Sequence, residues 1–497
     1  MNKAMQELRV LEKKLFALQY ALNVIDYDAE TVAPPESSEG RGDATAELSA
    51  FRHAILTSER FPRLLKEAAE GELNEQEAAE VRELTRDYKR ISVIPAEEYA
   101  DFSRLTTRAT SVWEKAKNKS DFALFAPYLE KIVAARRRFA GLLDPDKDPY
   151  DVLLDQFEEG LNMAACDSFF AELRKTLTPL VKRITEEGET PDTSCLKGPW
   201  DIEKQKELSA YVMQVMGIDR SHCTIGESEH PFTTEFYKGD VRITTHYFED
   251  DMASNLFSVV HEGGHALYEL HIADRLKGTC LAGGSTMGVH EGQSRLYENY
   301  IGRSLGFIRF LFPKMQELFP EKLGRVTPEE FYRAVNLARP SFIRTDADEV
   351  TYCLHIMVRY ELEKRLIGGT LSVKDVPAEW NRLMKEYLGV EVPNDKLGCL
   401  QDVHWATGDL GYFPSYALGT AYAAQIVDAM RHDFDLDTAL EKGELGKVSD
   451  WLTEHIWQYG REKSPRWLVE NACGAPFDPK YFTDYLTRKY SEIYRLK

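Results

Sequence analysis

The stretch VVHEGGHALYELH, from Val259 to His271, decides what kind of fold surrounds it. Apolar residues on both sides of its first two histidines predict a helix that lies largely in the protein interior. His261 and His265 lie about one turn apart on such a helix, so both imidazoles can reach one ion. Gly263 and Gly264 lie mid-helix, where each costs about 1 kcal/mol relative to alanine. Glycine is explained here if another part of the chain approaches this helix closely.

The segment His261-Glu262-Gly263-Gly264-His265 matches the HExxH pattern of zinc hydrolases. Neutral imidazole suits Zn²⁺, and a catalytic zinc takes three protein ligands and a water. Glu262 lies about 100° around the helix from His261, so it is placed to touch that water rather than the metal, as a general base. The alternative is a pair of surface histidines with a glutamate in a helix salt bridge, which the apolar flanks disfavour.

The third metal ligand has several candidates. His271 stands at the spacing used by metzincins, but Tyr268 replaces the glycine that would turn the chain, so His271 points away from the metal. The downstream carboxylates are Glu269, Asp274, Glu291 and Glu298. A glycine-rich segment, AGGSTMG (282–288), allows the chain to reverse and bring a second helix alongside the first. We therefore expect Glu291 as the third ligand, with Glu298 as the second choice.

Helical periodicity dominates the rest of the chain. An apolar stripe predicts a helix over residues 3–24, and APPESSEGRGD (33–43) is expected to break it. The Pro/Gly/Ser/Thr-rich loop at 188–201 separates two helical stretches. The chain is therefore expected to be a single domain, 1–497, with possible helical subdomains at about 1–195 and 196–497.

The clearest strand signal precedes the histidine helix. PFTTEFYKGDVRITTHYF (231–248) alternates β-branched or aromatic residues with polar ones, and Lys238-Gly239-Asp240 supplies a turn. This pattern predicts a β-hairpin, whose second strand, 241–247, is expected to pair with an extended peptide as edge strands can. The predicted fold class is mainly α, with a small β-sheet next to the HExxH helix.

Composition limits the possible partners and the location. The net charge of −20 disfavours nucleic acid and anionic membranes, because phosphate binding needs a basic surface. No apolar stretch is long enough to span a membrane, and the N-terminal residues lack the apolar region of a signal peptide. Seven cysteines without a CxxC pair indicate a reducing compartment, so a cytoplasmic location is expected.

Six short motifs occur in an order that resembles one known family. They are HPF (230–232), DVRIT (240–244), HEGGH (261–265), HEGQ (290–293), IRTDAD (343–348) and GCLQDVHW (398–405). Together they resemble the carboxypeptidase Taq family of zinc metallocarboxypeptidases over nearly the whole chain. The resemblance implies a large helical, nutcracker-like fold with a deep groove, Glu291 as third zinc ligand, and a homodimer. It also implies broad-specificity release of C-terminal residues from peptides, with proline disfavoured.

Further site residues follow from the chemistry and the resemblance. A tyrosine or histidine should stabilise the oxyanion; His404, Tyr412 and Tyr416 are the candidates, and the resemblance favours the first two. Their alternative role is core packing. His246 and His290 are expected to be structural or to support the metal ligands.

An exopeptidase also needs a positive group for the terminal carboxylate. The resemblance places Arg344 in the groove, so Arg344 is the first candidate, with Arg242 and His230 as others. The alternative for Arg344 is an ion pair with Asp346 or Asp348.

The sequence thus predicts a carboxypeptidase with one zinc ion per chain, although cobalt or manganese can occupy similar sites. A related helical zinc endo-oligopeptidase or dipeptidase is the first alternative. A non-catalytic, zinc-stabilised binding protein is the second.

Overall fold

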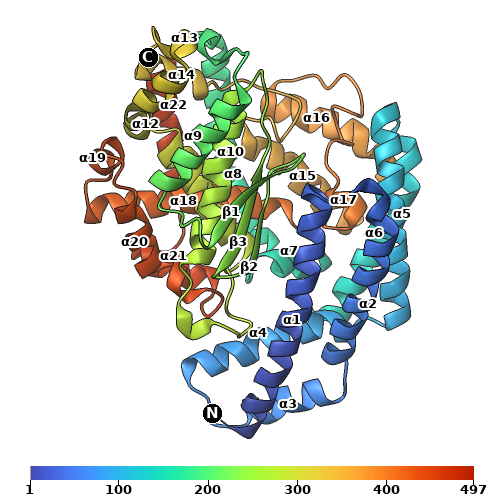
Figure 1. Cartoon of the computed structure of the whole chain (residues 1–497). Helices are drawn as coiled ribbons and strands as arrows, with labels where there is room; N and C mark the ends of the chain where they lie inside the picture. Colours follow the sequence, from blue (N-terminus) through green and yellow to red (C-terminus); the bar gives the residue numbers. More distant parts are fainter. Residues whose placement is uncertain (1) are drawn as a thin grey trace.

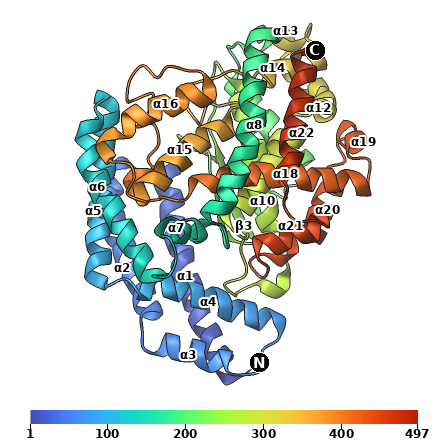
Figure 2. The same cartoon turned by 180° about the vertical axis from the view of Figure 1, so that it is seen from behind.

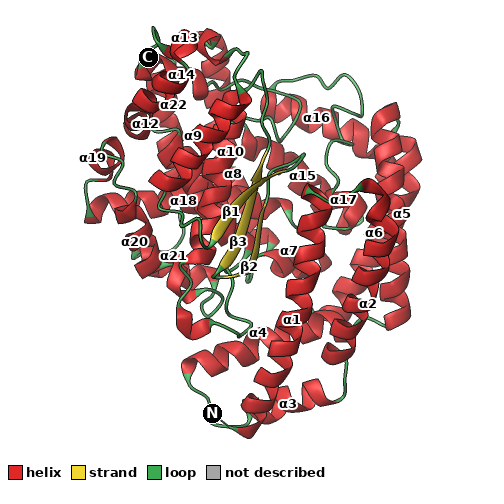
Figure 3. Ribbon diagram, in the orientation of Figure 1, coloured by secondary structure: helices red, strands yellow, loops and turns green. Residues whose placement is uncertain are grey.

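The chain folds almost entirely into helices, with three short strands beside the helix that carries the two histidines (Figures 1 and 3). A computed structural model describes residues 2–497. The α-helices are α1 (Lys3–Thr31), α2 (Ser38–Leu56), α3 (Arg60–Ala69), α4 (Glu75–Ser92), α5 (Ala96–Lys119), α6 (Phe122–Leu143), α7 (Pro149–Phe157), α8 (Met163–Glu187), α9 (Ile202–Val215), α10 (Met252–Leu270), α11 (Met287–Arg295), α12 (Leu305–Leu318), α13 (Pro320–Leu323), α14 (Pro328–Val335), α15 (Tyr352–Ile367), α16 (Val376–Leu388), α17 (His404–Thr407), α18 (Phe413–Asp433), α19 (Leu436–Glu441), α20 (Gly446–His455), α21 (Pro465–Cys473) and α22 (Lys480–Ile493). The predicted mainly α class is confirmed.

The sheet contains the predicted hairpin and one strand that was not predicted. Strands β2 (Thr233–Tyr237) and β3 (Asp240–Thr245) pair antiparallel, which confirms the hairpin. Strand β1 (Cys223–Glu227) runs parallel to β3. Its five residues include a glycine, so its sequence carries too short a pattern for recognition.

The strand order corrects one expectation. The order is β1-β3-β2, so β3 lies in the middle of the sheet and both of its edges are paired. Residues 241–247 therefore cannot add a peptide by edge pairing, and that prediction was wrong. Alternation in a sequence shows which faces a strand presents, but not whether its edges are free. Strand β2 is an edge strand.

Helix α10 lies at the centre of the molecule and packs against β3, α9 and α11 (Figure 1). It is buried on nearly all sides, as its apolar sequence predicts. The Asp251 side chain caps its first turn by accepting from the backbone N–H of Ser254. The helix ends at Leu270, and the His271 ring Nδ1 lies 2.7 Å from the Leu267 carbonyl oxygen.

The two glycines in α10 do have close neighbours. A Cβ on Gly264 would lie 2.8 Å from the carbonyl oxygen of Gln293 and from Cα of Ser294, both in α11. A Cβ on Gly263 would lie 2.6 Å from the Met216 side chain. On the far side of α11, a Cβ on Gly419 of α18 would lie 2.8 Å from Cβ of Glu291. Helix α11 is thus held tightly between α10 and α18.

The first helices of the chain form the blue and cyan part of Figure 1, below and to one side of the sheet. Helices α1, α3 and α4 share a small apolar core of their own, whereas one large core joins residues from α5 through α22. The break expected at 33–43 is shorter than predicted, because α2 already begins at Ser38. Pro34 and Pro35 end the first helix, and the exposed Gly40 and Gly42 are accommodated inside the second. Figure 2 shows α5, α6 and α7 from behind.

Within residues 2–497, none of the helices combines the length and the apolar character needed to cross a lipid bilayer.

Replacement of Gly264 by alanine tests the contact between α10 and α11. The added methyl group meets backbone atoms that cannot rotate away, so Gly264→Ala should destabilise the protein by about 1–3 kcal/mol and lower its Tm. Gly141→Ala is the matched control, because that helical position has nothing within 4 Å of the new Cβ and should leave the Tm equal or higher. Differential scanning calorimetry of both variants decides; equal effects would contradict the close approach.

Candidate active site

Two imidazoles and one carboxylate converge between α10 and α11. Ligand atoms of His261, His265 and Glu291 all lie within 4.8 Å of one another. The Nε2 atoms of His261 and His265 lie 3.8 and 3.6 Å from Oε2 of Glu291. Donor atoms around one tetrahedral Zn²⁺ are separated by roughly 3.4 Å. The donor set and its spacing therefore fit a divalent metal ion.

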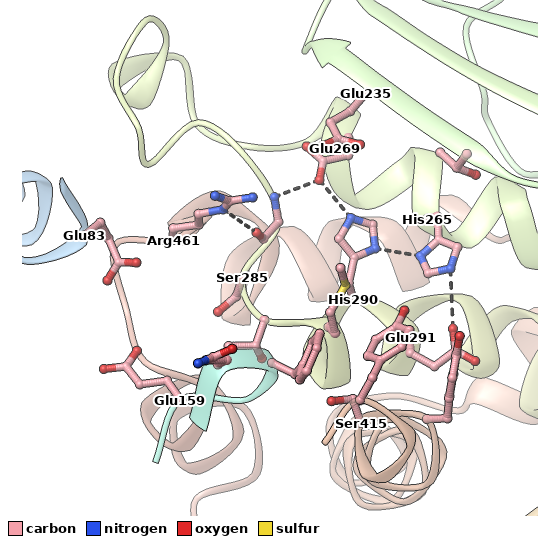
Figure 4. A pocket seen from close by; sticks show the side chains of 18 of the residues that line it. Glu83, Glu159, Glu235, His265, Glu269, Ser285, His290, Glu291, Ser415 and Arg461 are labelled. Atoms are coloured by element: carbon pink, nitrogen blue, oxygen red, sulfur yellow. Dashed lines mark hydrogen bonds and ion pairs between the residues drawn. The ribbon is translucent and has the colours of Figure 1, made fainter. Parts of the chain in front are cut away.

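Each imidazole is held by its other nitrogen. Nδ1 of His261 lies 2.9 Å from Oε2 of Glu298. Nδ1 of His265 lies 2.6 Å from Nδ1 of His290, whose Nε2 lies 2.8 Å from Oε1 of Glu269 (Figure 4). Such contacts orient metal-binding histidines.

These contacts define where the protons lie when both rings face a metal through Nε2. His261 then donates its Nδ1 proton to Glu298, and His265 donates to Nδ1 of His290. His290 consequently carries its proton on Nε2 and donates it to Glu269, which also accepts from the backbone N–H of Gly284 at 2.7 Å. His290, which was expected from the sequence to be structural or to support the metal ligands, therefore lies between His265 and Glu269.

The surroundings of the site favour an ionised Glu291 and a neutral His265. Burial opposes ionisation of Glu291, but Arg295, whose Nε donates to Oε1 at 2.8 Å, and the nearby histidines hold the pKa of that carboxyl well below its usual range. Burial lowers the pKa of His265 to about 3. Glu291 therefore has Oε2 directed at two imidazoles, of which that of His265 is uncharged at neutral pH.

Glu262 lies beside this group and not within it. It is buried, and its Oε2 accepts a 2.6 Å hydrogen bond from the hydroxyl of Thr233 on β2. Burial raises its pKa above the ordinary value of a glutamate. A carboxylate with a raised pKa next to a metal site has the properties of a general base.

Cavities open on two sides of the site. A cavity of about 480 Å³ is lined by Glu262, His265 and Glu291, and by Phe232 and Thr233. A second, of about 780 Å³, is lined by His261 and Glu262. A third, of about 530 Å³, is lined by Arg295, Glu298 and Arg344. An extended peptide could thus reach the metal group from either side.

Two of the three oxyanion candidates line the first cavity. Tyr412 and Tyr416 both border it, with their ring centres 4.8 Å apart. His404 lies behind them: its Nε2 is 3.3 Å from the hydroxyl of Tyr416, and its ring packs 4.5 Å from that of Phe413. Burial lowers the pKa of His404 to about 4, so the ring is neutral.

Arg344 is buried and has a carboxylate partner other than the two expected from the sequence. Its Nε donates to Asp402 at 2.9 Å, and its Nη1 donates to the hydroxyl of Tyr352 at 3.2 Å. Asp402 also accepts from Arg359 Nε at 2.7 Å. Asp402 is 58 residues from Arg344, so sequence spacing could not reveal this pairing.

The remaining predicted residues line none of these three cavities. Arg242 forms a two-bond ion pair with Asp240, and its guanidinium lies 4.3 Å from the Phe236 ring centre. His230 is exposed, next to Pro231, which lines the first cavity. His246 contacts the carbonyl oxygen of Ser228 at 2.9 Å.

Sequence reasoning missed Arg295 and Thr233. Arg295 stands four residues after Glu291 on one helix, a spacing that favours an ion pair and could have been noticed. Glu298 was considered only as a metal ligand. It lies in a π-helical turn, Leu296–Gly302, which changes the side-chain register and has no sequence signature.

A mainly helical chain with an HExxH pair beside a carboxylate has the architecture of a metallopeptidase. The profile of the carboxypeptidase Taq (M32) metallopeptidases matches residues 7–490. The chain is 41% identical to carboxypeptidase 1 of Bacillus subtilis (strain 168) over 500 residues, which cover 99% of this chain and 100% of that relative.

Solved structures agree with this assignment. An M32 carboxypeptidase from Deinococcus radiodurans R1 superposes with a TM-score of 0.97 at 34% identity, covering 100% of both chains. A carboxypeptidase of Pyrococcus furiosus, described as Apo-Mg, gives 0.96 at 37% identity and 99% coverage of both. The chain therefore belongs to the carboxypeptidase Taq (M32) family and is a metallocarboxypeptidase.

Two variants of Glu269 test the contacts that orient His265. Glu269→Ala removes the acceptor for His290 and should weaken metal affinity about 10–100-fold. Glu269→Gln is the matched control: its amide oxygen can occupy the position of Oε1, keep both hydrogen bonds and retain most of the affinity. Competition with a chelator of known affinity measures the metal affinity of each variant. Equal affinities of Glu269→Ala and the wild type would contradict the orienting role.

Proposed function

We propose that this chain is a zinc-dependent carboxypeptidase that releases C-terminal residues from peptides with broad specificity and disfavours proline. The observation that carries the proposal is the convergence of His261, His265 and Glu291, with Glu262 alongside, where two cavities meet. These three residues would hold the ion. In such a site zinc supplies Lewis acidity to an attacking water and to the scissile carbonyl.

Glu262 is proposed as the general base. It accepts a proton from the attacking water and delivers it to the leaving amine. Burial raises the pKa of Glu262, which makes the carboxylate a better proton acceptor than an exposed glutamate. Its hydrogen bond from Thr233 fixes the carboxylate on the side of strand β2.

Tyr412, Tyr416 and His404 are proposed to stabilise the negative oxygen that develops on the carbonyl. The two tyrosines border the cavity that contains Glu262. His404 acts through the hydroxyl of Tyr416, with which it is in contact. This arrangement makes His404 a residue that sets the direction of the Tyr416 hydroxyl.

Arg344 is proposed to bind the terminal carboxylate. Asp402 and Tyr352 engage its Nε and Nη1, and Nη2 is proposed to take the ligand. We keep Arg242, His230 and Tyr416 in the proposed substrate-binding set. The segments of Arg242 and His230 flank β2, which borders the first cavity, and Tyr416 lines that cavity. Helical subdomains at about 1–195 and 196–497 are proposed to flank this active-site groove.

The remaining aspects of the proposal rest on the family resemblance and on composition. They are a cytoplasmic location, a homodimer, peptide substrates and no binding of nucleic acid. A related endo-oligopeptidase or dipeptidase is the alternative function, and it shares every residue proposed above except the terminal anchor.

Removal of the proposed base separates hydrolysis from metal binding. Glu262→Gln keeps the hydrogen bond from Thr233 but cannot accept the proton, so kcat should fall about 10²–10⁴-fold with the metal content unchanged. Elemental analysis and a peptide hydrolysis assay on the same sample provide both readings. Full activity of this variant would contradict the role of Glu262.

The terminal anchor separates the two kinds of peptidase. Arg344→Gln should lower kcat/KM for C-terminal trimming about 10–100-fold, because a charged hydrogen bond to the substrate is lost. Arg365→Gln is the matched control, since Arg365 pairs with Glu379 and lines neither the first nor the third cavity. Mass spectrometry of a long peptide should show single-residue C-terminal losses in wild type; internal cuts that persist in Arg344→Gln would favour the endopeptidase.

A further inference from the structure

A separate small cavity lies beside the first cavity of the candidate active site, and it is lined by none of the three candidate metal ligands. Its volume is about 260 Å³, and its walls come from α4, α5, α6 and α7 (Figure 2). Four aromatic residues line it: Tyr99, Phe102, Phe139 and Phe157. The rings of Phe102 and Phe139 pack edge-to-face, with their centres 5.2 Å apart. The cavity therefore has largely aromatic walls, of which Tyr99 is 49% exposed to solvent.

Two arginines line this cavity and converge on one uncharged residue. Arg90 Nη2 donates to the carbonyl oxygen of Gln156 at 2.8 Å, and Arg136 Nη2 donates to the side-chain oxygen of Gln156, also at 2.8 Å. The Nε atom of Arg136 is buried and has no hydrogen-bond partner among residues 2–497. Arg136 also forms no ion pair within that range.

Neighbouring arginines are paired in the ordinary way. Arg86, one turn before Arg90 on α4, contacts Asp155 at 3.0 Å and Glu159 at 3.3 Å. Arg90 itself reaches a carboxylate only at 3.9 Å, that of Asp87. Arg90, whose side chain is 35% exposed, thus keeps only a long contact with a carboxylate, and Arg136 has a neutral amide in place of one.

The charge of Arg136 is compensated only from a distance. Burial lowers the pKa of both arginines, although Asp87, Asp155 and Glu83 favour the charge of Arg90, and Asp409 and Glu363 favour that of Arg136, without a hydrogen bond to either guanidinium. Guanidinium groups remain charged at any physiological pH, so the cost of burying them is relieved by an anion and not by deprotonation.

We propose that this cavity binds the carboxylate of a ligand whose apolar body lies against the aromatic walls. The unpartnered Nε–H group of Arg136 can donate to a carboxylate, and the aromatic walls match an apolar group of fragment size.

The small cavity adjoins the first cavity of the candidate active site. Arg90, Gln156 and Phe157 line both, and the Phe157 ring lies 5.0 Å from that of Tyr412. Two sources of the ligand share this chemistry: an acidic side chain of a bound peptide, away from its C-terminal residue, or a free small carboxylate. In either case the occupant contacts a residue that packs on the candidate active site.

A binding experiment on the full chain tests the free carboxylate. The probe is 3-phenylpropionate, and 3-phenylpropionamide is its uncharged match, both titrated by isothermal calorimetry. The carboxylate should bind and the amide should not. Arg136→Gln should weaken binding at least tenfold, and Leu143→Trp, which fills the cavity but keeps both cations, should abolish it. Loss of binding in Arg344→Gln, with retention in Arg136→Gln, would place the probe at Arg344 and not in the small cavity, and would overturn the proposal.

A peptide series tests the other source. Peptides that carry glutamate or glutamine at successive positions upstream of the scissile bond are compared by kcat/KM. At one position the wild type should prefer glutamate at least fivefold, and Arg136→Gln should remove that preference without changing hydrolysis of the glutamine peptide. If neither the free probe nor any glutamate position responds to Arg136→Gln or Leu143→Trp, the proposal is wrong. If no peptide is hydrolysed, the proposed function fails, whereas the calorimetric experiment still decides on the cavity.

Thermal unfolding shows whether a loss of binding in Arg136→Gln comes from a destabilised fold. Because Arg136→Gln removes a charge that is compensated only from a distance, its Tm should equal or exceed that of wild type. A large drop in Tm would show that Arg136 supports the fold, and Leu143→Trp then decides alone.

Discussion

The backbone of α11 lies so close to α10 and α18 that no methyl group fits at the contacts. Gly264 and Gly419 provide this closeness, one on each side of the segment that carries Glu291. A carboxylate has a short side chain, so it can join two imidazoles of another helix only if the two backbones nearly touch. The spacing of the three candidate ligands therefore depends on glycine at positions 264 and 419, where a Cβ atom would not fit.

Charge compensation is the second requirement. Glu291 is buried and Glu298 is half-buried beside two histidines, and Arg295 bonds to both carboxylates, at 2.8 and 3.0 Å. Without that guanidinium the two anions would repel each other in a medium that stabilises charge poorly. The π-helical turn after Arg295 brings Glu298 back toward His261. One short segment thus supplies a candidate metal ligand, Glu291, the cation that favours its ionised form, Arg295, and a carboxylate that contacts His261, Glu298.

The hydrogen-bond partners of other arginines in the interior show how Arg136 in the small cavity differs from them. Arg295, Arg344 and Arg359 each bond to a carboxylate at 2.9 Å or less. Arg136 instead has a neutral amide and an unpartnered Nε. Arg136 thus differs from these three arginines in having no carboxylate within hydrogen-bonding distance, and the proposed ligand would supply that anion from outside.

The sequence by itself determined what depends on local periodicity. Spacing along one helix placed His261 and His265 on a common face and Glu262 beside them, and alternation in 231–248 defined a hairpin. Glu291 was expected from a glycine-rich reversal and a family motif, and the structure brings it to the histidines. The order of motifs was sufficient for the family.

Only the tertiary structure decided which partners distant residues take. The pairs Glu269–His290 and Arg344–Asp402, the parallel strand β1, the central position of β3 and the convergence of Arg90 and Arg136 all join segments without a shared repeat. A side chain's direction follows from its own helix or strand, but its partner is set by how elements pack, and packing depends on shape and volume over the whole core. For that reason the three residues that converge could be named from the sequence as candidate metal ligands, whereas the residues that contact them from other elements could not.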